Sequence, residues 1–171
     1  FPSNDGGTNS INIGFDFSFY EDSYSECIVN ANGWLGFGEN NTEWSNTSIP
    51  SESAPRSAIF GFWDDLNPVN DNCNQYCSGN VYVNSNSDRF VVWFDQVAHW
   101  WTGFENSFYD FQIVLYPNGE IQLNYREITG THAATIGIQN ESGTVGLQVA
   151  YNNDYVHNNL SVKLIKSESV D

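Results

Sequence analysis

The chain has 171 residues, 40% of them hydrophobic and 16% aromatic, which is enough for one domain with an ordered core. Twenty-one Asp and Glu residues oppose five Lys and Arg residues, and the formal net charge is −16 at pH 7. This balance argues against nucleic acid or an anionic membrane as a partner, because phosphate groups are contacted mainly by Lys and Arg. No apolar run approaches the ~18 residues that a membrane-spanning helix needs, so membrane insertion is not expected.

Short apolar segments separated by turn residues follow one another along the chain. In residues 11–19, apolar side chains alternate with polar or small ones, which is typical of a strand with one buried face. Asn32-Gly33 and Asn118-Gly119 are suited to the positive φ angles of tight hairpins. No segment shows the apolar period of about 3.6 residues that marks a helix. The predicted strands are residues 11–19, 26–30, 34–38, 57–63, 80–84, 89–97, 108–116, 120–125, 134–139, 145–150 and 160–166.

About ten short strands with frequent turn signals predict an all-β fold, an antiparallel β-sandwich of the jelly-roll kind. No repeat or linker divides the sequence, so residues 1–171 are expected to form a single β-sandwich domain. The polar tail at 167–171 is expected to be frayed. The chain starts at Phe1 and contains no Met, which predicts a domain excised from a larger secreted protein.

Three cysteines allow at most one internal disulfide. Cys73 and Cys77 flank a polar tripeptide in a loop, and a local disulfide between them is predicted for an oxidising, extracellular compartment. Cys27 lies in an apolar strand pattern and is expected to be a buried thiol. Trp34 and Trp63 also lie in strand patterns and are expected in the core.

Three phrases occur in order: Asn-Gly-Trp-Leu-Gly-Phe at 32–37, Gly-Phe-Trp-Asp-Asp-Leu-Asn-Pro at 61–68, and Leu-Tyr-Pro-Asn-Gly-Glu-Ile at 115–121. With the strands between them, from 11 to 146, they resemble the nidogen-like extracellular domain. They are also similar to β-sandwich accessory modules of secreted bacterial proteases and adhesins. The resemblance implies a secreted, extracellular, non-catalytic module with an interaction role, such as cell adhesion. It does not imply a particular ligand.

Oxygen-bearing side chains follow the apolar strand 57–63. Carboxylate and amide oxygens suit Ca²⁺, which takes about six to eight oxygen ligands, although the spacing is not that of an EF-hand. The alternative is that Asp64 or Asp65 caps the turn by accepting backbone N–H groups. A structural calcium ion would relieve repulsion in this acidic chain, and high external salt is the other explanation of the acidity. The predicted calcium ligands are Asp64, Asp65, Asn67 and Asp71.

Aromatic residues gather in the loop that joins the predicted strands 89–97 and 108–116. Rigid, exposed rings provide contact area for a ligand such as a sugar at a low entropic cost. The alternative is that one Trp covers the end of the sandwich as a lid. The predicted ligand-binding residues are Trp100, Trp101, His99, Trp44 and Tyr109, the last two extending the platform.

No catalytic signature accompanies these features, since neither a G-x-S-x-G elbow nor an H-E-x-x-H motif is present. The leading prediction is a non-catalytic module that contacts a polysaccharide, a matrix protein or a neighbouring domain. One alternative is a jelly-roll polysaccharide hydrolase or lyase that uses two carboxylates among Glu105, Glu120, Glu127 and Asp95. The other is a structural spacer or folding domain of an adhesin or protease.

Overall fold

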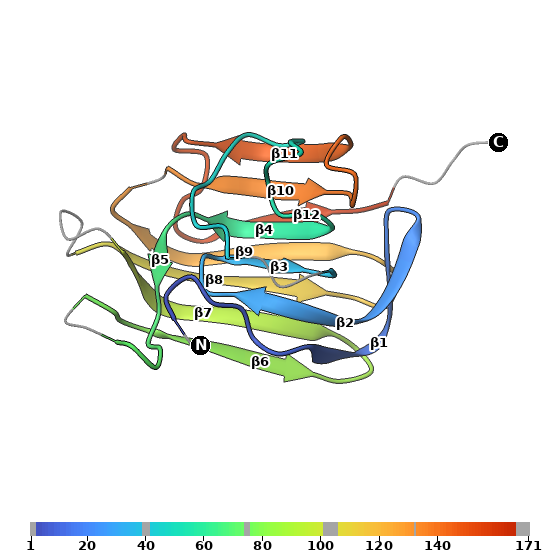
Figure 1. The fold of residues 1–171 in the computed structure, drawn as a ribbon, viewed down its shortest axis with the longest axis horizontal. Helices are drawn as coiled ribbons and strands as arrows, with labels where there is room; N and C mark the ends of the chain where they lie inside the picture. The colour runs from blue at the N-terminus through green and yellow to red at the C-terminus, as the bar shows by residue number, and fades with distance from the viewer. Residues whose placement is uncertain (1–2, 39–41, 74–75, 101–105, 132, 167–171) are drawn as a thin grey trace.

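The computed structural model describes residues 3–38, 42–73, 76–100, 106–131 and 133–166, and these form two stacked antiparallel sheets without a helix (Figure 1). The predicted β-sandwich is confirmed. None of the described segments is a helix suited to crossing a membrane. The strands are β1 (Ile11–Phe19), β2 (Asp22–Asn30), β3 (Trp34–Gly36), β4 (Ala58–Trp63), β5 (Leu66–Asn67), β6 (Asn80–Ser85), β7 (Phe90–His99), β8 (Phe108–Leu115), β9 (Ile121–Thr129), β10 (Thr135–Gln139), β11 (Gly146–Tyr151) and β12 (Leu160–Leu164).

The first sheet has the strand order β1-β2-β3-β4-β10-β11, and the second has the order β12-β9-β8-β7 with β5 and β6 on the remaining edge of β7. Strands β1 to β4 and β6 to β9 are neighbours both in sequence and in space. Each of these runs is a β-meander, and the strand order within each sheet, which the sequence left open, is thereby defined. The reason is local, because tight turns such as Asn118-Gly119 return the chain to the adjacent position.

The main core lies between the two sheets and is rich in aromatic rings. Phe94 and Phe111, on neighbouring strands of the second sheet, stack with ring centroids 4.5 Å apart. Phe62, from the first sheet, lies 4.5 Å from the Tyr109 ring. Cys27 is also buried here, and burial raises the pKa of its thiol to about 12, so it stays protonated. The predicted buried thiol is confirmed.

A second, smaller cluster covers the outer side of the first sheet. Strand β4 is buried along its whole length, because its inner side faces the main core and its outer side is covered by the loop before it. Trp34 and Trp63 are buried in this cluster, as predicted. Both indole N–H groups donate to the carbonyl oxygen of Glu43, at 3.3 and 3.2 Å. The covering loop is therefore tied to the sheet directly beside Trp44.

The loop between β5 and β6 is closed by a disulfide between Cys73 and Cys77, whose Cα atoms are 5.6 Å apart. The predicted local disulfide is confirmed. Beyond the disulfide, the Ser78 N–H donates to the Asn67 carbonyl oxygen on β5, and the Val69 N–H donates to the Gly79 carbonyl oxygen across the loop. The predicted frayed tail, 167–171, lies outside the described residues.

Candidate functional site

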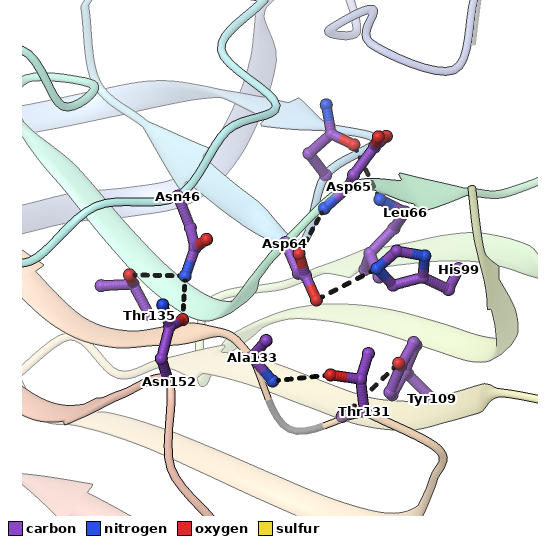
Figure 2. A network of polar contacts seen from close by, with 11 residues as sticks. Asn46, Asp64, Asp65, Leu66, His99, Tyr109, Thr131, Ala133, Thr135 and Asn152 are labelled. Carbon is purple, nitrogen blue, oxygen red and sulfur yellow. Dashed lines mark hydrogen bonds and ion pairs between the residues drawn. The ribbon is translucent and has the colours of Figure 1, made fainter. Parts of the chain in front are cut away.

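The turn between β4 and β5 carries Asp64 and Asp65 and faces His99 at the end of β7 (Figure 2). Asp64 Oδ1 accepts a hydrogen bond from the backbone N–H of Asp65 at 2.9 Å. Its other oxygen, Oδ2, lies 3.3 Å from His99 Nε2. Leu66, which follows Asp65, donates its backbone N–H to Asn32 Oδ1 at 2.9 Å. The turn is thus held by side chains from three segments, and Asp64 has the capping role considered as the alternative to metal binding.

Asp65 is a partly buried carboxyl group with an unusual protonation equilibrium. Burial, together with the neighbouring carboxylates of Asp5 and Asp64, raises its pKa to about 7, while His99 opposes the shift. Asp65 Oδ1 is buried and accepts no hydrogen bond within the described residues. Near neutral pH, Asp65 is therefore protonated in a large fraction of the protein molecules, whereas an ordinary aspartate would be ionised.

Asp5 belongs to the irregular segment before β1 and is held in place by amide side chains. Its Oδ1 accepts hydrogen bonds from Asn32 at 3.2 Å and from Asn4 at 3.0 Å. Its backbone oxygen accepts a hydrogen bond from Asn30 at 3.2 Å. Asn32 therefore helps to position the carboxyl groups of both Asp5 and Asp65, because it contacts Asp5 directly and accepts the N–H of Leu66, the residue after Asp65.

A pocket of about 370 Å³ opens above these carboxyl groups at the end of the sandwich; its lining is Asn4, Asp5, Trp44, Asp65 and Trp100. We call it the sandwich-end pocket. Trp44 is 50% exposed and Trp100 is 36% exposed. These two Trp residues come from separate loops. The fold brings them to one site with Asp65, which the sequence predicted as a calcium ligand. An opening lined by rings and a few fixed polar groups is typical of a ligand site.

The remaining predicted ligand-binding residues are placed differently. His99 is not among the residues that line the pocket, and its side chain, only 9% exposed, contacts Asp64. Tyr109 is fully buried and does not extend an exposed platform, because its register on β8 turns it into the core. Its hydroxyl donates to the carbonyl oxygen of Thr131 at 3.1 Å, and burial, with a contribution from Asp64, raises its pKa. Trp101 lies outside the described residues.

The four predicted calcium ligands do not converge on one point. Asn67 is buried, and its Oδ1 accepts a hydrogen bond from the Asn70 side chain at 3.3 Å. Asp71 is exposed on the β5–β6 loop. Among the residues the structure describes, no group of three or more His, Cys, Asp or Glu side chains is placed to hold a metal ion. Calcium binding at this turn stays a prediction of the sequence.

Sequence reasoning missed Asn4 and Asp5, which line the pocket. They precede the first strand in a polar stretch without periodicity, so nothing in the local pattern marks them. The only signal was the Asn-rich hairpin at residues 30–32, whose amide groups need partners when buried. Those partners include Asp5, and the N-terminal segment is joined to the hairpin by them.

A protein-family model described as NIDO related matches residues 2–170. The chain belongs to this family. The resemblance to nidogen-like domains is therefore confirmed over nearly the whole chain, and it supports an extracellular-type binding or accessory domain. The Cys73–Cys77 disulfide of this NIDO-related domain fits that setting. No curated protein and no solved structure matches the chain.

Proposed function

We propose that this NIDO-related domain is a secreted, non-catalytic module that binds a polysaccharide through the sandwich-end pocket. The observation that carries the proposal is the position of Trp44 and Trp100, two exposed indole rings from separate loops beside the carboxyl groups of Asp5 and Asp65. Indole rings stack on the C–H faces of sugars, and carboxyl groups hydrogen-bond to sugar hydroxyls.

The site is held in place before a ligand arrives. The loop bearing Trp44 is fixed by the Glu43 carbonyl oxygen on one side of that residue. Further along the loop, Asn46 donates to Thr135 Oγ1 at 3.2 Å and to Asn152 Oδ1 at 2.8 Å (Figure 2). Binding to such a site loses less conformational entropy than binding to a mobile loop, which favours affinity.

The proposal is tested by sedimentation of the domain with insoluble cellulose, chitin and xylan. We expect saturable binding to at least one polymer, weakened about tenfold or more in Trp44→Ala and Trp100→Ala because each substitution removes a stacking surface. Tyr155→Ala is the matched control, since Tyr155 is 48% exposed and does not line the pocket. Equal binding by all variants, or no binding to any polymer, would refute this function for these ligands.

The same experiment, run in calcium and in EDTA, addresses the calcium prediction. A loss of binding in EDTA that calcium restores would support a metal site beside the pocket, whereas unchanged binding would argue that Asp64 acts only as a turn cap. The Asp65→Asn variant further distinguishes a metal site from a turn that is only capped. It removes a potential ligand charge without changing the size of the side chain.

One observation favours a second candidate function, hydrolysis of the polysaccharide. Asp65, with a pKa of about 7, lies beside Asp5 in a pocket with two Trp rings, and a glycosidase uses a protonated and an ionised carboxyl group. In that reaction Asp65 would protonate the leaving oxygen and Asp5 would act as nucleophile or base. Reducing sugar released by the wild type and not by Asp65→Asn would establish it, and binding without release would exclude it for that polymer.

A further inference from the structure

A row of five uncharged side chains crosses the outer face of the second sheet. Direct cross-strand pairing places Tyr82 opposite Trp93, Trp93 opposite Gln112, Gln112 opposite Asn124 and Asn124 opposite Ser161. The next residue on β7, Phe94, is buried in the core, so the row is on the side away from it. Five strands at spacings of about 4.8 Å give the row a length of about 19 Å. We call it the cross-strand row.

The aromatic half of the row is rigid. Tyr82 is 50% exposed, and its ring lies 5.5 Å from the Trp93 ring. The Trp93 indole N–H donates to Asp110 Oδ1 at 3.0 Å, and the guanidinium of Arg126 lies 5.6 Å from the centre of the Trp93 ring. Asp110 is only 1% exposed and also pairs with Arg126. Burial of a carboxylate on the outer side of a sheet is costly, and here it fixes the orientation of an indole ring.

The polar half is a network of amide and hydroxyl groups. Gln122 Nε2 donates to Asn124 Oδ1 and to Ser161 Oγ, both at 3.0 Å. Ser161 donates to the same Asn124 oxygen at 2.8 Å, and Tyr116 donates to Gln122 Oε1 at 3.2 Å. Because Asn124 Oδ1 accepts hydrogen bonds from both Gln122 and Ser161, the orientation of its amide group is fixed by the network.

Cationic side chains lie among the carboxylates on both sides of the cross-strand row, although beside Trp93 the single cation Arg126 shares its site with Asp110, Asp95 and, through Gln96, Glu127. On one side Arg126 contacts Asp110 and lies 3.7 Å from Asp95, and on the other Lys163 lies 2.9 Å from Glu120. Two of the chain's five cationic residues are therefore placed beside the row, in a domain with a net charge of −16. The row itself carries no formal charge, which complements an uncharged polymer and offers no opposite charge to a strongly ionic one.

We propose that the cross-strand row is a second binding site, separate from the sandwich-end pocket, for an uncharged polysaccharide chain. The exposed Tyr82 ring stacks on a sugar ring beside Trp93, whose own ring is contacted by the Arg126 guanidinium, and the amide groups of Gln112 and Asn124 hydrogen-bond to hydroxyls further along the chain. The row is long enough for an oligosaccharide segment, so affinity rises with chain length. The inference shares its ligand class with the proposed function and rests on different residues, which makes the two separable.

The test uses the full chain in sedimentation with cellulose, chitin and xylan, and with anionic alginate as a fourth polymer. Tyr82→Ala and Gln112→Ala are each expected to weaken binding to a neutral polymer about fivefold, while Tyr155→Ala, an equally exposed Tyr elsewhere, leaves it unchanged. The Trp44→Ala/Trp100→Ala double variant is expected to retain the binding that depends on Tyr82.

A direct readout is the nuclear magnetic resonance signals of the Trp93 indole N–H and of the Gln112 and Asn124 side-chain amides, followed during titration with cellohexaose, chitohexaose and xylohexaose. At least one sugar is expected to shift them in the wild type, with smaller shifts for its disaccharide. Binding lost only in the Trp44 and Trp100 variants, with these signals unmoved, overturns the second site alone. Binding to alginate only overturns the second site, and binding to no polymer overturns both sites.

Discussion

Replacing Gly33 by Ala is expected to lower the free energy of unfolding by about 3 kcal/mol. Gly33 has a φ of +82°, a left-handed conformation that side chains disfavour, and an added Cβ would collide with the carbonyl oxygen of Phe62. The glycine also accepts hydrogen bonds through its own carbonyl oxygen from Gly61 at 3.1 Å and from Phe62 at 3.0 Å. Relief of the collision therefore disturbs the contact between this turn and β4.

Urea unfolding followed by Trp fluorescence measures the effect. Gly38→Ala is the matched control, because a Cβ at Gly38 meets open space, and its stability is expected to stay within about 0.5 kcal/mol of the wild type. The turn at Gly33 also presents Asn32 to Asp5 and Leu66, so weaker polysaccharide binding is expected beside the loss of stability. Equal midpoints for Gly33→Ala and Gly38→Ala would contradict this account of the turn.

The sequence predicted those strands whose alternation is set by the core. Residues 11–19 were predicted with the bounds that β1 has, because each inward position is filled by an apolar side chain. Strand β2 begins at Asp22, earlier than predicted, since its first residues are polar and become a strand only by pairing with β1. Strand β5 has two residues and was missed, because it exists through its pairing with the end of β7.

The candidate site was predicted in part. Exposed Trp residues in polar loops were a sound signal for Trp44 and Trp100, yet no periodicity reveals that the two loops meet. Tyr109 was misjudged because it lies near a loop in sequence, whereas its exposure is set by the register of β8 against β7 and β9. The cross-strand row was not predicted either. It is defined by pairing across five strands, and each member alone is an ordinary polar or aromatic strand residue.

Asp65→Asn is expected to stabilise the domain at pH 8 and to change little at pH 4. The folded-state pKa of Asp65 is about 7, above the unfolded value of about 3.9, so the folded state binds more protons between these two values. Stability contributed by this group is therefore highest below about pH 4, falls as the pH rises from about 4 to 7, and stays low above that. The asparagine variant does not ionise and lacks this loss.

The difference at pH 8 is expected to be about 2 kcal/mol in favour of Asp65→Asn, less than the full pKa shift implies because the carboxyl group is partly accessible to solvent. Urea midpoints of both proteins from pH 4 to 8 measure it, and Asp71→Asn, which removes an exposed carboxylate from the next loop, is the control. Curves for wild type and Asp65→Asn that run parallel over this range would show that Asp65 ionises as an ordinary aspartate.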